Sequence, residues 1–322
     1  MRVLITGITG FAGSYMAEYI LGLNQNIEVY GTKRFTSSLH NVKHLLDKIT
    51  LIECELRDQN CVDYTVAQVK PDKIFHLAAQ TYIPASFAYP LDTLVTNITS
   101  TLALMEAVKK NKLDTLLHFC SSSEVYGRVE KNEVPINEYN QMRPQNPYAV
   151  SKCTCDLLVQ QYYASYKMKV MISRAFGYIG PRAKDVFAYS SFAKQIVEIE
   201  KGLREPVIHV GNLKSVRTFL DIRDVVDAYW IMTEKCDFGE VYVIGSDQTM
   251  ELEELLNKLL SLSTVGKNVR VEVDKNRLRA SDVTLQIPDS TKFIQKTGWK
   301  PKITIDQSMK DLLDYWRKEI KC

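Results

Sequence analysis

Short, uninterrupted hydrophobic runs alternate with longer segments of helical periodicity through the first half of the chain. The runs predict β-strands at roughly 2–6, 27–32, 49–53, 73–77, 115–121 and 168–174. Runs such as KIFHLAA and TLLHFCSSS lack the polar alternation of a half-exposed strand and are typical of strands buried on both faces. Because helical segments separate the strands, the pattern predicts a parallel sheet with helices on both faces.

After about residue 175 the alternation of strands and helices becomes less regular. The pattern there predicts a helix at roughly 187–202, a strand in PVIHVG, a helix in LEELLNKLLSL and a closing helix in QSMKDLLDYW. We predict an α/β protein with a Rossmann-type doubly wound parallel sheet at 1–174 and a smaller C-terminal α/β lobe at 175–322. A later segment near 218–236 is expected to cross back to the first domain.

Composition narrows the functional classes. The chain has 322 residues, of which 45% are hydrophobic, enough for a sizeable core. A net charge of +3 does not indicate a nucleic-acid or membrane partner, and no apolar stretch is long enough to span a bilayer. The strand and glycine loop begin almost at the first residue, which argues against a signal peptide. Seven cysteines without a CxxC pair favour a reduced cytoplasmic protein without a metal site.

A glycine loop follows the first predicted strand. In LITGITGFAGS, residues 4–14, glycines recur at Gly7, Gly10 and Gly13, before a predicted helix. The first allows a tight turn, the second a close approach of pyrophosphate to the backbone, and the third close packing of helix on strand. The helix N-terminus then offers free amides to phosphate, to which Phe11 and Ala12 contribute. The position in a βαβ series favours dinucleotide binding over an ordinary glycine-rich turn.

The second strand bears on which dinucleotide binds. It ends in a basic turn, VYGTKRFTSS, rather than in an acidic residue that would bind a ribose. Lys33, Arg34 and Ser37 are suited to bind a 2′-phosphate, so NADP(H) is favoured, with NAD(H) as the alternative. If these residues bind no phosphate, they simply form a solvated basic turn. Further cofactor contacts are expected from the ends of the next two strands, at Glu55 and Leu56 for the adenine and at Leu77, Ala78 and Ala79 for the cofactor backbone.

A candidate catalytic set lies in CSSSEVYG and NPYAVSK. Tyr148 and Lys152 are four residues apart, so they share one face of a helix. A nearby ammonium is expected to lower the phenol pKa, which suits Tyr148 to exchange a proton with a sugar or alcohol oxygen. Ser122 follows the fifth strand, where ligands of doubly wound sheets bind, and is expected to bind the same oxygen. Glu124 would add a carboxylate to this pocket. The alternative without a catalytic role is an ordinary carboxylate in a loop or at a helix start.

Together, GxxGxxG, SSSE and YxxxK resemble the extended short-chain dehydrogenase/reductases that modify nucleotide sugars. The stretches GITGFAGSYMAEYIL, KRFTSS, LAAQTYIPASF and SSSEVYG are similar to GDP-mannose 4,6-dehydratases. The second half, from FAKQIVEIEKGLREPVIHVGNL to RLRASDVTLQIPDSTKF, looks closer to GDP-6-deoxy-4-keto-mannose reductases. The resemblance covers essentially the whole chain and implies a GDP-sugar substrate in the cleft between the lobes.

The same resemblance implies several substrate-binding residues. Arg217 and Arg279 would bind the diphosphate, since a guanidinium fork matches phosphate oxygens. Asn212 and Lys194 would lie near the nucleotide, although a turn cap and a solvated helix residue explain them equally well. Gln80 is a further candidate. The chain departs from the dehydratase pattern at Gly177, where relatives often have Asn, and it lacks their arginine-rich stretch.

Two reactions fit these residues. A reductase would use Tyr148 to protonate O4 during hydride transfer to C4, with Lys152 orienting the nicotinamide ribose so that both residues also contact the cofactor. A 4,6-dehydratase would also need Glu124 as a second acid or base. The shorter chain and its second half favour the reductase. A C4 epimerase and a non-catalytic NADP-sensing protein are weaker alternatives. The resemblance also implies a homodimer, or a tetramer, formed through helices at roughly 93–110 and 148–167.

Overall fold

A seven-stranded parallel sheet forms the centre of the computed structural model, which describes residues 1–266, 268–278, 283 and 285–321. The strand order is β11-β6-β5-β4-β1-β2-β3, and every neighbouring pair is parallel. The strands are β1 (Arg2–Thr6), β2 (Glu28–Lys33), β3 (Thr50–Glu53), β4 (Lys73–His76), β5 (Leu116–Cys120), β6 (Val170–Ala175) and β11 (Val241–Ile244). The predicted Rossmann-type fold is confirmed. The strand β11 comes from the second half of the chain and joins the sheet beside β6, so the strand pattern of the first half does not predict it.

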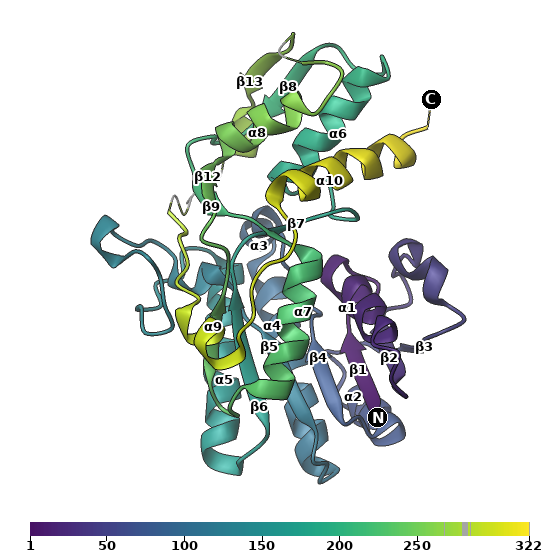
Figure 1. Cartoon of the computed structure of the whole chain (residues 1–322). Helices are drawn as coiled ribbons and strands as arrows, with labels where there is room; N and C mark the ends of the chain where they lie inside the picture. Colours follow the sequence, from purple (N-terminus) through teal and green to yellow (C-terminus); the bar gives the residue numbers. More distant parts are fainter. Residues whose placement is uncertain (267, 279–282, 284, 322) are drawn as a thin grey trace.

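Helices cover both faces of this sheet, as Figure 1 shows. Alternate residues of β1 enter different cores: Val3 and Ile5 pack with one face and Leu4 with the other, which explains why the strand is hydrophobic throughout. One face packs against α1 (Phe11–Gly22), α7 (Ile222–Lys235) and α9 (Thr291–Thr297). The other packs against α2 (Gln59–Val69), α4 (Pro90–Lys110) and α5 (Pro147–Tyr166).

A separate hydrophobic core lies in the upper part of Figure 1. It is built mainly from α6 (Ala188–Glu200), α8 (Leu252–Ser261) and α10 (Ile305–Glu319). Three short strand pairs accompany these helices: β8 (Val207–Val210) with β13 (Arg270–Val273), β9 (Val216–Thr218) with β12 (Thr249–Glu251), and β7 (Tyr178–Ile179) with β10 (Leu220–Asp221). We refer to this part as the upper lobe.

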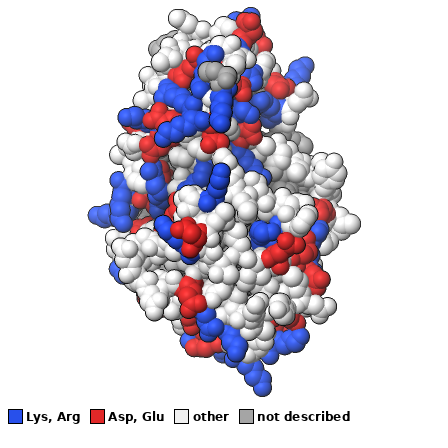
Figure 2. All heavy atoms as spheres, turned by 90° about the vertical axis from the view of Figure 1, so that its right-hand side faces the viewer, with Lys and Arg blue, Asp and Glu red and all other residues white. Residues whose placement is uncertain are grey.

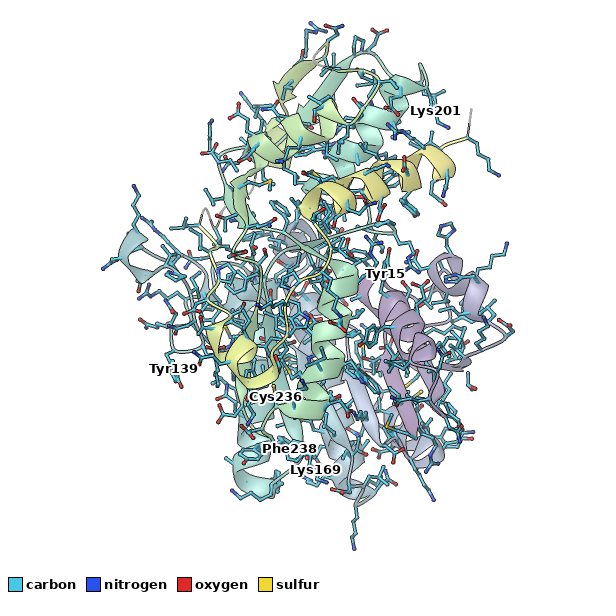
Figure 3. All side chains as sticks on the ribbon, in the orientation of Figure 1. Tyr15, Tyr139, Lys169, Lys201, Cys236 and Phe238 are labelled. Atoms are coloured by element: carbon cyan, nitrogen blue, oxygen red, sulfur yellow. The ribbon has the colours of Figure 1, made fainter. Side chains whose placement is uncertain are left out.

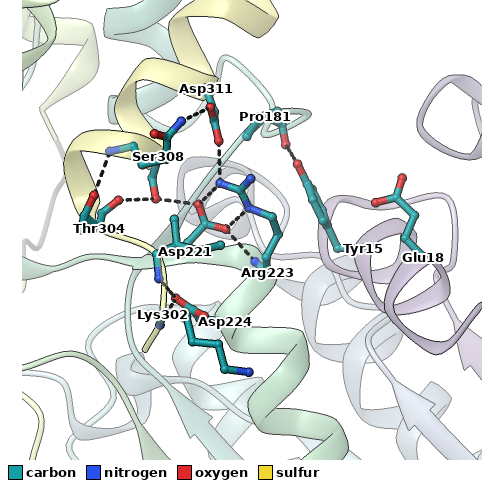
Figure 4. A network of polar contacts seen from close by, with 12 residues as sticks. Tyr15, Glu18, Pro181, Asp221, Arg223, Asp224, Lys302, Thr304, Ser308 and Asp311 are labelled. Atoms are coloured by element: carbon teal, nitrogen blue, oxygen red, sulfur yellow. Dashed lines mark hydrogen bonds and ion pairs between the residues drawn. The ribbon is translucent and has the colours of Figure 1, made fainter. Parts of the chain in front are cut away.

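Polar contacts attach the upper lobe to the large sheet. Asp221 begins α7 by accepting a 2.8 Å hydrogen bond from the backbone N–H of Arg223, and it also accepts one of 2.6 Å from Ser308 on α10. Arg223 bridges Asp221 to Asp311, also on α10 (Figure 4). On α1, Tyr15 faces the lobe (Figure 3) and donates to the carbonyl oxygen of Pro181 at 3.3 Å. These contacts fix the lobe above the carboxyl ends of the strands.

The surface carries charges of both signs. On the face drawn in Figure 2, Lys and Arg side chains are interspersed with Asp and Glu, most densely over the upper part of the molecule. Within the described ranges, no helix has the length and apolar character that crossing a bilayer requires.

Candidate active site

A cleft of about 1740 Å³ lies between the carboxyl ends of the strands and the upper lobe. It brings together most of the residues singled out from the sequence, although they come from positions 7 to 217. Those lining it are Gly7, Gly10, Phe11, Ala12, Gly13, Lys33, Arg34, Ser37, Glu55, Leu56, Leu77, Ala78, Ala79, Gln80, Ser122, Glu124, Tyr148, Asn212 and Arg217. Doubly wound sheets bind ligands at this edge because the strands present free backbone groups and loops there.

The glycine loop forms one end of the cleft. Gly7 has a φ of +69°, and a Cβ there would lie 2.9 Å from Cα of Ala78 on the neighbouring strand end. A Cβ on Gly13 would lie 2.3 Å from the carbonyl oxygen of Gly7, so only glycine lets α1 approach the strand this closely. No side chain caps the first turn of α1, which begins after Gly10. This cradle has the shape and the backbone donors that a pyrophosphate requires.

The basic turn after β2 lies beside the loop. Lys33 pairs with Glu53 at 3.2 Å, and the hydroxyl of Ser37 accepts a 3.0 Å hydrogen bond from the backbone of Arg34. Glu55 accepts two hydrogen bonds from the guanidinium of Arg57, and these hold the pKa of its carboxyl below the usual value. Arg57 also lines the cleft, and no motif in the sequence distinguishes it from other surface arginines.

Tyr148 and Lys152 lie on the first two turns of α5. Asn146 caps this helix by accepting a 2.8 Å hydrogen bond from the backbone of Ala149, and Pro147 follows it at the first helical position. Tyr148 lines the cleft, whereas Lys152 lies behind it and donates a 2.6 Å hydrogen bond to the carbonyl oxygen of Cys120.

The structure corrects the expected tuning of Tyr148. Burial raises the pKa of its phenol well above the ordinary value, while a hydrogen bond with Ser122 lowers it in part. The ammonium of Lys152 instead donates its hydrogen bond to the carbonyl oxygen of Cys120. The predicted lowering of the Tyr148 pKa by Lys152 is therefore not found. The phenol is therefore protonated at neutral pH, the form in which it can give a proton.

Glu124 lies on the short 3₁₀ turn η2 (Ser123–Tyr126) that follows β5, and Ser122 directly precedes this turn. The hydroxyl of Ser122 accepts a 3.2 Å hydrogen bond from the backbone of Glu124 and so caps this turn. The carboxylate of Glu124 accepts a 3.0 Å hydrogen bond from the side chain of Asn146. Asn146 therefore orients both the helix that carries Tyr148 and the carboxylate beside it.

The substrate-binding candidates have different surroundings. The amide of Gln80 donates to Thr93 at 3.0 Å and accepts from the backbone of Tyr82 at 2.6 Å, so it braces a turn. Asn212 accepts a 2.9 Å hydrogen bond from the backbone of Lys214, so its side chain caps a turn. Arg217 lies on β9, and one of its nitrogens is 3.3 Å from the carbonyl oxygen of Val216.

Two other candidates stand apart from this set. Lys194 does not line the cleft, because its ammonium is paired at 2.6 Å with Asp185, which does. Arg279 lies outside the described residues. Arg277, which the sequence did not single out, lines the cleft, with one guanidinium nitrogen 2.8 Å from the hydroxyl of Ser191.

Further cleft residues come from the upper lobe and had no local signal in the sequence. Arg182 has a φ of +71°, pairs with Glu18 at 2.7 Å and lies 3.6 Å above the ring of Tyr15. The start of α6 and the distant helix α10 add aromatic walls, contributed by Phe187, Tyr189, Tyr315 and Trp316. Only the packing of α10 on α6 brings the last two residues to this place.

A parallel sheet with a glycine loop at its first strand, and with Ser, Tyr and Lys gathered at β5 and α5, defines the extended short-chain dehydrogenase/reductase class. A sequence model described as GDP-mannose 4,6 dehydratase matches residues 4–312, so the chain belongs to this family. The predicted family resemblance is thereby confirmed.

Individual relatives match over nearly the whole chain. A Pseudomonas aeruginosa protein named GDP-6-deoxy-D-mannose reductase is 31% identical over 99% of this chain and 98% of its own length. A Caenorhabditis elegans protein named GDP-mannose 4,6 dehydratase 2 is 29% identical over 96% of this chain and 87% of its own length. Among solved structures, RMD from Pseudomonas aeruginosa complexed with NADPH is similar with a TM-score of 0.85, 29% identity and 99% coverage of both chains.

Proposed function

We propose that the protein uses NADPH to reduce the C4 ketone of GDP-4-keto-6-deoxymannose to a GDP-6-deoxyhexose. The observation that carries this proposal is the end-to-end match with the Pseudomonas reductase, 98% of whose length is covered. The dehydratase relatives are longer, and the match covers 87% of the nematode protein and 92% of a Yersinia enterocolitica one. The neighbour solved with NADPH supports the choice of cofactor.

The cleft residues divide this reaction between them. When bound, NADPH supplies the hydride that reduces C4. The glycine cradle at Gly7 to Gly13 holds the pyrophosphate, and Lys33 and Arg34 are the cations available to a 2′-phosphate. Tyr148 transfers its phenolic proton to O4 while Ser122 donates a hydrogen bond to the same oxygen, so the ketone becomes an alcohol. The tyrosinate then takes a proton from solvent.

Reduction needs Tyr148 in its protonated form. Since burial raises its pKa, the phenol reaches the ketone already carrying the proton that the product needs. Lys152 holds the end of β5 against α5 and so keeps Ser122 in reach of Tyr148.

A GDP-mannose 4,6-dehydratase is the second candidate because Glu124 lines the cleft beside Tyr148, where a second acid or base would be needed. In that reaction C4 is oxidised, water is lost across C5 and C6, and the hydride returns to C6. The hydrogen bond from Asn146 leaves one oxygen of Glu124 for such a role.

Mass spectrometry of nucleotide sugars separates the two reactions. GDP-mannose with NADP⁺ should be recovered unchanged from a reductase, whereas a dehydratase removes one water without net cofactor reduction. The 4-keto-6-deoxy sugar with NADPH should then gain two hydrogens as NADPH is consumed. Tyr148→Phe is the control. If wild-type protein dehydrates GDP-mannose and leaves the keto sugar untouched, the reductase proposal is wrong.

We also propose that the protein is a homodimer formed through α4 and α5, which pack against each other. Their outer surfaces expose large apolar side chains, including Leu91, Val95 and Leu157. Leu157→Lys should convert a dimer into a monomer in light scattering after size exclusion. Leu203→Lys in the upper lobe is a matched control, since Leu203 and Leu157 are 55% and 58% exposed. A wild-type monomer would contradict the proposal.

A further inference from the structure

Gln286 connects the catalytic turn to the strand that carries Arg217. Its backbone N–H donates to the carbonyl oxygen of Val216 at 3.2 Å, at the start of β9. Its side-chain oxygen accepts a 3.1 Å hydrogen bond from Ser123, which lies between Ser122 and Glu124 on η2. The side chain forms part of the cleft wall. It therefore lies between the group proposed to act at the ketone and the arginine proposed to bind the diphosphate.

The other end of this amide has no partner. Gln286 is only 4% exposed, and its Nε2 atom is buried without a hydrogen bond to any described residue. Buried polar groups are nearly always paired, because leaving one unpaired costs free energy. Flipping the amide would exchange its oxygen and its nitrogen. One of the two atoms would still contact Ser123, and the other would still be left for a ligand.

We propose that the Gln286 amide hydrogen-bonds a hydroxyl of the hexose and is a specificity-determining residue, an inference that rests on the proposed GDP-sugar activity. A hydroxyl both donates and accepts, so it complements the amide in either orientation. The terminal torsion of glutamine is broad, so the amide can rotate its free end from the wall toward the cleft at little cost. The hydroxyl of Ser123 also rotates, so it can follow the opposite end and keep its hydrogen bond.

The test compares a ligand that carries the hexose with one that lacks it. The affinities of GDP-mannose and of GDP are measured by isothermal titration on NADPH-loaded protein, since NADPH prevents oxidation of the probe. Gln286→Met keeps the length of the side chain and removes both polar atoms. We expect it to weaken GDP-mannose binding about five- to tenfold, the range of one neutral hydrogen bond, and to leave GDP binding unchanged.

Gln307→Met is the matched control, because Gln307 is an exposed glutamine on α10 outside the cleft. It should leave both affinities and the melting temperature unchanged. If Gln286→Met fails to fold, Gln286→Asn draws the amide back by one methylene and should show the same selective loss. The inference is confirmed only by a loss confined to the hexose-bearing ligand.

Other results overturn it in distinguishable ways. Equal loss of GDP and GDP-mannose binding would make Gln286 a structural residue. Unchanged binding of both would mean that its free amide meets a buried water and not the sugar. If wild-type protein binds neither GDP nor GDP-mannose, the proposed function itself fails and this inference fails with it.

Discussion

The Nζ atom of Lys152 lies 2.6 Å from the carbonyl oxygen of Cys120, the last residue of β5. Lys152 is buried, and its ammonium also lies 4.8 Å above the ring of Phe119 on the same strand. A cation held this way ties the second turn of α5 to the strand end from which Ser122 follows. The spacing between Ser122 and Tyr148 therefore depends on Lys152.

Lys152→Met should lower the turnover of the keto sugar by at least about a hundredfold, the scale of a lost acid–base contribution. The variant removes the donor to Cys120 and frees the strand end from the helix. Steady-state kinetics measure the effect, and circular dichroism checks the fold. Turnover within a few-fold of wild type would show that Lys152 does not position the site.

Tyr148→Phe should lower turnover by about 10²- to 10⁴-fold and leave NADPH binding intact. Because burial raises the pKa of the phenol, wild-type Tyr148 stays protonated from about pH 7 to about pH 9, and the reduction rate should not fall there through loss of its proton. A pH profile of single-turnover reduction tests this. A fall centred near neutral pH that is absent in Tyr148→Phe would contradict it.

Gly13→Ala should destabilise the protein by about 1–3 kcal/mol or more and abolish cofactor binding. Its Cβ would lie 2.3 Å from the Gly7 carbonyl oxygen, a backbone atom that cannot move without opening the loop. Gly22→Ala at the end of the same helix is the control, because its Cβ meets nothing within 4 Å. It should be neutral or stabilise by up to about 1 kcal/mol. Urea unfolding measures both, and equal effects would refute the steric explanation.

Asp156→Asn should cost about 3–5 kcal/mol of unfolding free energy. Arg174 donates to both carboxylate oxygens at 3.0 Å, and Ser121 adds a third hydrogen bond at 2.8 Å, all within the buried contact of α5 with β6. The variant leaves the buried guanidinium without its counter-charge.

The exposed pair Lys169 and Asp114 provides the comparison for Asp156→Asn. Lys169 lies at the lower end of the molecule, away from the upper lobe (Figure 3), and pairs with Asp114 at 2.6 Å. Because solvent screens this pair, Asp114→Asn should cost no more than about 1 kcal/mol. Similar losses for the two variants would show that burial does not set the strength of the Asp156 contact.

Stability should fall as the pH drops below about 6.5, because His76 and His118 are buried in neutral form. Burial, and secondarily the ammonium of Lys152, lowers the pKa of each to about 3. Between these pKa values the unfolded chain binds protons that the folded protein refuses, so their contribution is full above about pH 6.5 and is lost toward pH 3. Each histidine should contribute a slope of about 1.4 kcal/mol per pH unit. His118→Leu should reduce the slope of unfolding free energy by about that amount, and an unchanged slope would contradict the assignment.

The sequence was most informative where a function needs residues that are close along the chain. The glycine loop joins a strand to the helix that follows it, and Tyr148 and Lys152 are one helical turn apart, so spacing alone placed them. The central strands β1, β4, β5 and β6 were recognisable because burial on both faces requires continuous apolar runs. Family membership followed from these local motifs together.

Only the tertiary structure decided which distant residues complete the cleft. Lys194 and Arg277 carry similar charge, yet packing turns one toward Asp185 and places the other in the cleft wall. The burial of Gln286 beside Ser123, with one end of its amide left without a partner, arises because two segments far apart in the sequence meet there. The pKa of Tyr148 likewise depends on burial, which raises it, whereas the lowering expected from the neighbouring lysine is not found. The spacing of residues determines secondary structure and local motifs, whereas burial and long-range contacts arise only when the whole chain packs.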